Sequence, residues 1–173
     1  VSTLDPALQT LAETLVAEDN AAGRNTRALL LVHHGVIRAE AYAQGADAQT
    51  PLLGWSMAKS LVAIMLGNLE MRGLLDLSAR PGFEQWQDAR AEIDITDLLT
   101  MTDGLAFAEE YDPGDDATAM LFTEPSMSDY ALAVPLANPP GTVFNYSSGT
   151  ANLLARLHHD TLGGPAAAYT DFM

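Results

Sequence analysis

The stretch that most constrains this chain is residues 54–60, Gly-Trp-Ser-Met-Ala-Lys-Ser, followed by an apolar run that ends near Gly73. Almost every residue over 56–72 favours a helix, and Gly73 is a typical helix stop. Most of these residues are apolar, which is typical of a helix buried inside a domain. We therefore expect one buried helix over 56–72, around which the rest of the chain is organised.

Two reactive side chains lie one turn apart on this expected helix. Ser56 and Lys59 are spaced i, i+3, so both point from the same face. The first turn of a helix has unpaired backbone N–H groups and the positive end of the helix dipole, which favour negative charge developing on Ser56. The spacing predicts a nucleophilic serine beside an amine.

Chance is the competing explanation, since a serine three residues before a lysine occurs roughly once in a few hundred residues. The basic residues of this chain argue against it. Of the 8 Lys and Arg residues, Lys59 is the single Lys. Arg stays protonated in proteins, whereas a partly buried Lys can lose its proton and then act as a base. We therefore interpret the pair as catalytic.

The charge of the chain excludes several classes of partner. Its 23 acidic and 8 basic residues give a net charge of −15, which repels nucleic acid and anionic membrane surfaces. The absence of Cys excludes disulfides, a thiolate nucleophile and a zinc–thiolate site. No apolar run reaches the roughly 18 residues of a membrane span. Periplasm and cytoplasm both remain open as the compartment.

The length of 173 residues and 48% hydrophobic content predict one domain with a packed core. Two apolar runs around His34-Gly35 predict a β-hairpin over 27–43. Helical spacing and stop signals predict further helices over residues 6–19, 96–101, 126–134, 150–162 and 166–173. Thr96 is the predicted cap of the helix over 96–101.

Three clusters of polar residues have ordinary explanations. The acidic stretch 109–116 lacks the regular alternation of ligands in an EF-hand loop, so a solvated loop over a cleft is favoured over a calcium site. His33 and His34 lie at a strand end with no third ligand nearby in the sequence. His158 and His159 suit the last turn of a helix, where cations are stabilised. We therefore expect no metal site.

Three motifs occur in an order that resembles a known superfamily. They are Ser56-Met57-Ala58-Lys59, the stretch 98–105 (Leu-Leu-Thr-Met-Thr-Asp-Gly-Leu), and Pro-Pro-Gly-Thr at 139–142 leading to Tyr146-Ser147-Ser148. This order resembles the serine β-lactamases and penicillin-binding proteins from Arg27 onward. Within them it is most similar to the class C-like branch, with its esterases, D-aminopeptidases and 6-aminohexanoate-dimer hydrolases. The resemblance implies an α+β fold, with an antiparallel sheet flanked by helices and a helical subdomain.

The resemblance also implies roles for single residues. Ser56 matches the acylated nucleophile, Lys59 its partner base, and Tyr146 the residue that passes the proton to the leaving group. Ser148 stands where β-lactamases have Asn, which favours the esterase and amidase side of the superfamily. Tyr111 resembles a substrate-contacting tyrosine on a mobile loop, so Ser148 and Tyr111 are the expected substrate-binding residues. No metal or organic cofactor is implied.

Three functions remain open from the sequence. The first is a serine hydrolase that forms an acyl-enzyme on a small ester, amide or peptide-like substrate. The second is a non-catalytic domain that binds penicillin or a peptidoglycan fragment. The third is a structural partner that has lost activity, although retention of both Ser56 and Lys59 argues against it.

The hairpin is the one convincing β signal, and a two-stranded ribbon is marginal by itself. The superfamily implies a five-stranded sheet and a third motif, K-T-G or H-x-G, neither of which follows Tyr146 here. We therefore expect residues 1–173 to be the N-terminal portion of one domain, paired with a C-terminal half.

Overall fold

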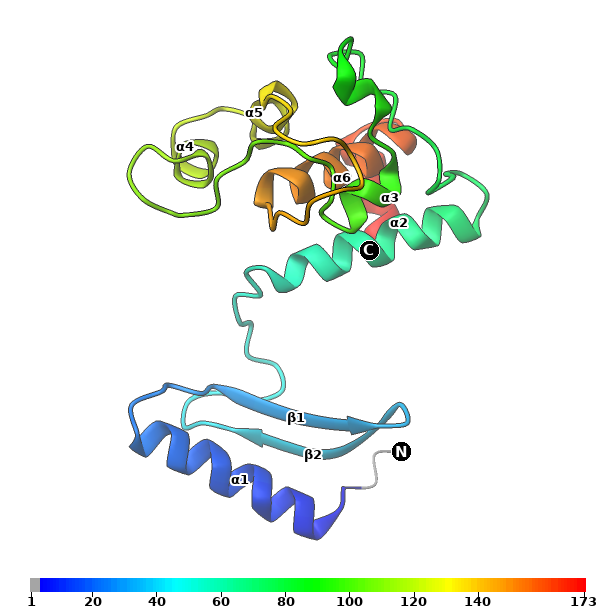
Figure 1. Cartoon of the computed structure of the whole chain (residues 1–173). Helices are drawn as coiled ribbons and strands as arrows, with labels where there is room; N and C mark the ends of the chain where they lie inside the picture. The colour runs from blue at the N-terminus through cyan, green and yellow to red at the C-terminus, as the bar shows by residue number, and fades with distance from the viewer. Residues whose placement is uncertain (1–3) are drawn as a thin grey trace. The chain divides into compact units, whose positions relative to one another are not determined.

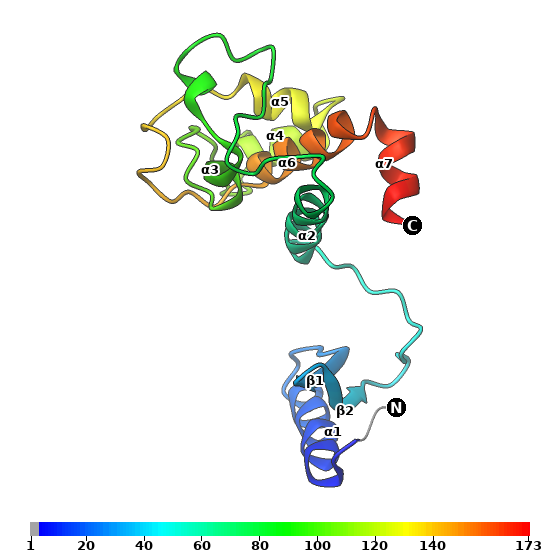
Figure 2. The same cartoon turned by 90° about the vertical axis from the view of Figure 1, so that its right-hand side faces the viewer.

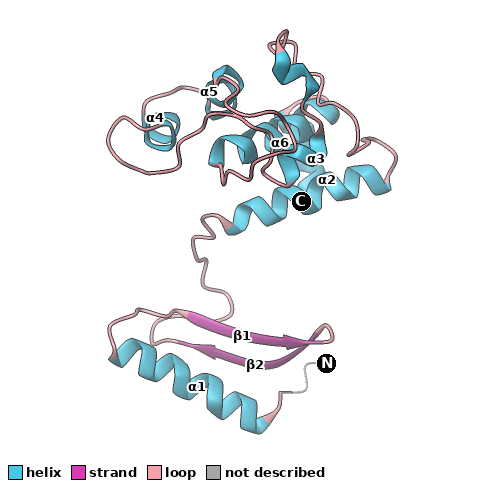
Figure 3. Ribbon diagram, in the orientation of Figure 1, coloured by secondary structure: helices cyan, strands magenta, loops and turns pink. Residues whose placement is uncertain are grey.

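The computed structural model describes residues 4–173. These residues form two compact units, one up to Leu53 and one from Gly54 onward, and each is described by itself. Figure 3 shows that the first unit contains the strands and that the second consists of helices joined by loops.

The first unit is a helix packed on a β-hairpin (Figure 1). Helix α1 spans Pro6–Ala21, strand β1 spans Ala28–His33 and strand β2 spans Val36–Tyr42. The strands pair antiparallel through a two-residue turn in which His34 and Gly35 both have positive φ, 50° and 73°. Turns of this kind match the twist of the flanking strands. The hairpin predicted over 27–43 is confirmed.

Helix α1 is held to the hairpin by a small core and by polar contacts. Asp5 caps the helix by accepting the backbone N–H groups of Ala7 and Leu8. The Gln9 side chain accepts the Glu40 N–H at 3.0 Å and donates to the Glu40 carbonyl at 2.9 Å. Figure 2 shows α1 lying along the hairpin. The buried residues between them are Ala12, Val16, Ala39 and Ala41.

The second unit is built around one central helix, α6 (Ser148–Thr161). Every other α-helix of residues 54–173 packs against α6: these are α2 (Met57–Met71), α3 (Ile95–Leu99), α4 (Asp116–Phe122), α5 (Met127–Ala133) and α7 (Pro165–Phe172). A short 3₁₀-helix, η1, spans Ala89–Glu92. These helices share one hydrophobic core, to which α2, α3 and α6 contribute the fully buried residues Leu66, Leu98 and Leu153. The helix expected over 150–162 is therefore confirmed, and it begins two residues earlier.

Two local details differ from the sequence prediction. The cap of α3 is Asp94 and not Thr96, because Asp94 forms a capping box with Asp97 and so satisfies two backbone N–H groups at once. Helix α4 was not predicted, and its cap is Asp115, which accepts the Thr118 N–H. Asp115 and Asp116 belong to the acidic stretch 109–116, which the sequence predicts as a loop, and this hid the short helix although Asp is a good N-cap.

Helix α2 confirms the helix predicted over 56–72 but is buried on one face only. Leu66 and Leu69 are fully buried, facing the core of residues 54–173. Within the same unit, an apolar stripe on the other side of α2 is exposed: Met57, Leu61, Ile64 and Met71. The expectation of an all-round buried helix is therefore wrong for this unit, because α6 covers a single face. None of the described helices is long and apolar enough to cross a membrane.

Candidate active site

The candidate nucleophile lies at the start of α2. Ser56 is the N-cap residue of this helix, and Lys59 follows one turn later. The Lys59 Nζ atom lies 3.2 Å from the Ser56 Oγ atom. The side chain of Ser56 makes no capping bond to its own helix, so its hydroxyl remains available to Lys59. The structure thus brings together the pair that the i, i+3 spacing predicted.

The backbone just before Ser56 is strained. Trp55 has a φ of 44°, in the left-handed region that a bulky residue rarely adopts. Strain of this kind costs about 1–3 kcal/mol and clusters at functional sites, where the surrounding structure holds it. The side chain of Trp55 is 81% exposed, so burial of the indole does not explain the strain. The strained turn at Trp55 sets the direction in which the backbone enters α2 at Ser56.

Tyr146 lies beside the amine of Lys59. The Lys59 Nζ atom is 4.8 Å from the centroid of the Tyr146 ring, within range of a cation–π interaction. The pKa of Tyr146 is lowered, first by hydrogen bonding from Ser56 and then by Lys59, while burial and the charge of Glu109 act in the opposite direction. The phenolate form of Tyr146 is therefore stabilised by the same two residues that the sequence assigned to catalysis.

Ser148 lies on the other side of Lys59. It is the first residue of α6, and the Lys59 Nζ atom lies 3.0 Å from its Oγ atom. The cap of α6 is the preceding residue, Ser147, whose hydroxyl accepts the Thr150 N–H at 2.9 Å. Since Ser147 caps α6, the hydroxyl of Ser148 is not needed as the cap and bonds to Lys59 instead. Lys59 thus lies between two hydroxyl groups from distant parts of the sequence.

The segment that holds Tyr146 is fixed by the loop after α3. The Asn145 backbone N–H donates to the Met101 carbonyl at 2.8 Å, and its side-chain amide donates to the Phe107 carbonyl at 3.0 Å. Gly149 lies so close to the Phe107 ring that an added Cβ would meet it at 2.6 Å. Only glycine permits this contact, which places the start of α6 directly on the loop.

Glu109 is a member of the site that the sequence prediction missed. Its carboxylate accepts the Ser148 N–H at 2.6 Å, the Ser148 hydroxyl, and the Tyr111 hydroxyl at 2.7 Å. In the sequence this residue is one of several acids in a loop, and nothing in the order of residues distinguishes it from Glu110. A three-dimensional contact between residues 39 positions apart was needed to identify it.

Tyr111 is placed near the site by this contact. It has a φ of 57°, its side chain is more than half exposed, and Glu109 accepts its hydroxyl proton. Hydrogen bonding to Glu109, followed by burial, raises the pKa of Tyr111, and Ser148 lowers it. The pKa values of the two tyrosines therefore shift in opposite directions: the environment favours the protonated form of Tyr111 and the phenolate form of Tyr146.

The rest of the acidic loop holds the fold together. Asp115 caps α4, and Asp116 accepts the Ala108 N–H at 2.8 Å and the Tyr130 hydroxyl at 2.6 Å. The bond to Asp116 is the main cause that raises the pKa of Tyr130 to about 12. Among residues 4–173, no group of three or more His, Asp and Glu side chains is arranged to hold a metal ion.

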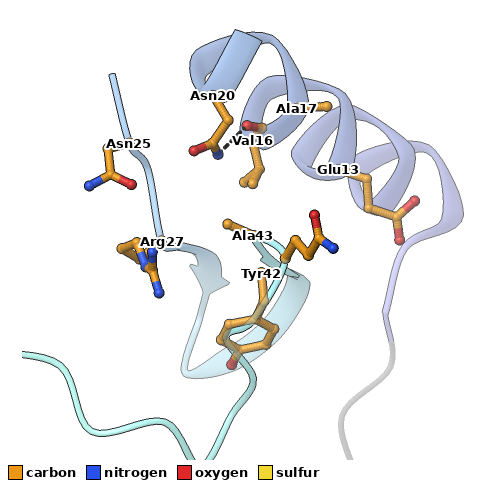
Figure 4. Close-up of a pocket in the computed structure, with 9 residues that line it drawn as sticks. Glu13, Val16, Ala17, Asn20, Asn25, Arg27, Tyr42 and Ala43 are labelled. Carbon is orange, nitrogen blue, oxygen red and sulfur yellow. Dashed lines mark hydrogen bonds between the residues drawn. The ribbon is translucent and has the colours of Figure 1, made fainter. Parts of the chain in front are cut away.

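A separate hollow lies in the first unit, between α1 and the hairpin. Figure 4 shows its lining, with Asn20 donating to the Val16 carbonyl within α1 and Arg27 and Tyr42 on the strand side. All of its lining residues lie between 13 and 44, so none of the site residues named above belongs to it. It contains no serine beside a base, and we assign it no catalytic role.

Comparison with known proteins agrees with this arrangement. The sequence profile of the family described as Beta-lactamase matches residues 11–171. Among solved structures, a Bacillus anthracis protein named as a 6-aminohexanoate-dimer hydrolase is similar, with a TM-score of 0.71 and 18% sequence identity. The similarity covers 89% of this chain and 45% of that chain, so this chain spans less than half of that protein. No curated protein matches the sequence.

At 18% identity, the likeness to the Bacillus anthracis protein concerns the fold. The family match extends over nearly the whole chain and includes both units. The chain therefore has a β-lactamase-like α+β fold and belongs to the β-lactamase family, within the superfamily of serine β-lactamases and penicillin-binding proteins.

Proposed function

We propose that this chain contains the nucleophilic part of a serine hydrolase that forms an acyl-enzyme at Ser56. The observation that supports the proposal most strongly is the position of Lys59. Its Nζ atom lies within hydrogen-bond distance of Ser56 and Ser148 and beside the ring of Tyr146. A serine hydroxyl becomes a good nucleophile only when a neighbouring base removes its proton, and this arrangement supplies one.

The proposed acylation step moves one proton through this group. Neutral Lys59 takes the hydroxyl proton of Ser56 while Oγ attacks the carbonyl carbon of the substrate. The tetrahedral intermediate collapses as the Tyr146 hydroxyl gives its proton to the leaving alcohol or amine. Lys59 then returns its proton to the Tyr146 phenolate, which restores the starting state of the pair. The result is an ester between Ser56 and the acyl group.

Deacylation runs through the same residues in reverse. Water takes the place of the leaving group, gives a proton to the pair and attacks the ester carbon. The pair returns this proton to the Ser56 Oγ atom as the ester bond breaks, and the carboxylic acid is released. The backbone N–H of Ser56 lies at the N-terminus of α2 and donates one hydrogen bond to the oxyanion, where the dipole of α2 adds positive potential. No metal or organic cofactor takes part in this scheme.

We propose a small ester or linear amide as the substrate. Ser148 supplies a hydroxyl beside Lys59 where β-lactamases have an amide side chain, which disfavours a β-lactam as the natural substrate. The half-exposed ring of Tyr111 is suited to contact a substrate from the loop side. The fold neighbour named as a 6-aminohexanoate-dimer hydrolase is consistent with this class.

Further polypeptide is needed for the complete enzyme in this proposal. Within residues 54–173 the apolar stripe of α2 stays exposed, and in the first unit Leu30 and Val32 of β1 are exposed as well. Exposed apolar patches of this kind mark surfaces that other polypeptide covers. The chain spans 45% of its fold neighbour. We propose that the remaining strands of a β-lactamase-like sheet cover these surfaces and supply the second oxyanion donor.

The test is covalent labelling of the full protein with a fluorophosphonate and with a fluorescent penicillin. Ser56→Ala is expected to abolish labelling and to leave the thermal unfolding temperature nearly unchanged, whereas Ser60→Ala, an exposed serine of the same helix, is expected to label normally. Label that mass spectrometry locates on another serine would disprove the assignment of Ser56. Stable labelling by the penicillin, together with no release of product from ester or amide substrates, would instead support the penicillin-binding alternative.

A further inference from the structure

The carboxylate of Glu109 occupies an unusual position for an acid in a loop. It accepts three hydrogen bonds, two from Ser148 and one from Tyr111, and it lies in the same group of side chains as Lys59. The proposed reaction gives Glu109 no proton to transfer.

The backbone around Glu109 is firmly placed. Phe107, two residues before it, is buried and packs on Gly149. The Ala108 N–H, one residue before it, donates to Asp116 at 2.8 Å. Because these anchors belong to the hydrophobic core and to α4, the carboxylate is held at the start of α6 by the fold and not by its own contacts alone.

Hydrogen-bond direction decides what Glu109 does there. A carboxylate only accepts, and a serine hydroxyl has a single proton. Since the Ser148 proton points to Glu109, the Ser148 Oγ atom must accept from the Lys59 Nζ atom at 3.0 Å. One N–H group of Lys59 is thus used as a donor to Ser148. When Lys59 is neutral, its lone pair is free to face the hydroxyl of Ser56 at 3.2 Å.

On this basis we propose, resting on the function above, that Glu109 is a positioning residue that orients Lys59 toward Ser56 through the hydroxyl of Ser148. The same carboxylate fixes the Tyr111 hydroxyl, so the loop of Tyr111 and the base of the reaction share one anchor. Ser147 already caps α6, so a simple capping role leaves the bond to the Ser148 hydroxyl unexplained.

The charge of Glu109 adds a second consequence. The groups that act on Tyr146 are Ser56 and Lys59 from α2 and Glu109 and Tyr111 from the loop. Burial disfavours the phenolate of Tyr146, and so does the negative charge of Glu109. Labelling of Ser56 requires the Lys59–Tyr146 pair to have lost one proton. A nearby negative charge holds that proton to higher pH. Removing the charge is therefore expected to move the acidic limb of the pH profile to lower pH.

Glu109→Gln tests both consequences with little change in shape. The amide has one accepting oxygen and an NH₂ group that only donates, so the direction of the Ser148 bond is no longer fixed. The measurement is the second-order rate constant for fluorophosphonate labelling of Ser56 as a function of pH, in the full protein. We expect a plateau roughly 10- to 100-fold lower, the size of effect that misplacement of a reacting group produces, and an acidic limb at lower pH.

Glu110→Gln is the matched control, because it removes the same charge from the next residue, which is exposed. It is expected to keep both the plateau and the limb of the wild type. If Glu109→Gln behaves like Glu110→Gln, the proposal for Glu109 is refuted while wild-type labelling still supports the hydrolase. If the wild type is not labelled at all, the proposed function itself fails.

Ser148→Ala separates positioning from general support of the fold. If Glu109 acts through Ser148, Ser148→Ala lowers the plateau by a similar factor, and adding Glu109→Gln lowers it little further. Additive losses, or a normal plateau in Ser148→Ala, would overturn the proposal. This second variant also decides the question if Glu109→Gln proves unstable by circular dichroism.

Discussion

One methyl group added at Gly104 should disturb both the fold and the backbone segment that leads to Tyr146. Gly104 has a φ of 78°, and a Cβ atom there would lie 2.1 Å from the Asn138 carbonyl oxygen. The left-handed backbone costs about 1–2 kcal/mol for a residue with a Cβ. Overpacking against a neighbour that cannot rotate away adds about 1–3 kcal/mol. We therefore expect Gly104→Ala to lower the free energy of unfolding by about 2–5 kcal/mol.

The matched control is Gly73→Ala at the end of α2. Gly73 has a similar φ of 70°, but a Cβ there would meet no atom within 4 Å. Gly73→Ala should therefore lower the free energy of unfolding only by the cost of the left-handed backbone, about 1–2 kcal/mol. Urea unfolding followed by circular dichroism measures both variants. At a slope of about 2 kcal/mol per M, the Gly104 variant should unfold at a urea concentration about 1–2.5 M lower than the wild type.

The site should respond as well, because Gly104 lies in the loop that positions Tyr146. Its carbonyl accepts the N–H groups of Ala137 and Asn138 at 2.8 and 3.1 Å, and this segment continues to Tyr146. Displacing Asn138 should slow labelling of Ser56 at urea concentrations where the variant is still folded. Equal losses of stability in the two glycine variants would refute the steric argument, since the two residues share the same backbone conformation.

Four further outcomes are expected. Lys59→Arg keeps the charge but cannot give up a proton, so turnover should fall nearly as far as in Lys59→Ala; near-normal turnover would reduce Lys59 to an electrostatic role. Tyr146→Phe should slow turnover roughly 10²- to 10⁴-fold, the usual contribution of a general acid, and a smaller loss would point to another proton donor. Burial raises the pKa of Asp103 above its unfolded value, so its stabilising contribution is complete at low pH and is lost as pH rises through the window between the two values. Asp103→Asn should therefore gain stability relative to the wild type as pH rises from about 4, as measured by urea unfolding at several pH values; a difference that is constant with pH would contradict this. Residues 1–173 expressed alone should associate and show no turnover, and adding the remainder of a β-lactamase-like domain should restore it; a monomeric, fully active chain would contradict this.

Much of the fold follows from local sequence signals. The apolar run before Gly73 predicted α2, and His34-Gly35 between two apolar runs predicted the hairpin, because helical spacing and turn chemistry act over a few residues. Helix α4 was missed for the opposite reason. Its capping residue, Asp115, belongs to a run of acids that favours a loop when no packing partner is known.

The pairing of Ser56 with Lys59 was likewise decided by the sequence, since two side chains three residues apart on one helix must face the same way. The contacts that turn this pair into a site are different in kind. Ser148 is 89 residues from Lys59, and Glu109 is 39 residues from Ser148. Nothing local selects these partners. They meet because α6 packs on α2 and because Phe107 fits only against a glycine at the start of α6. The sequence alone therefore determined that the hydroxyl of Ser56 and the amine of Lys59 lie side by side. The tertiary packing of α6 decided which hydroxyl lies beside that amine and which carboxylate bonds to this hydroxyl, because only burial of the shared core brings such distant groups within hydrogen-bond reach.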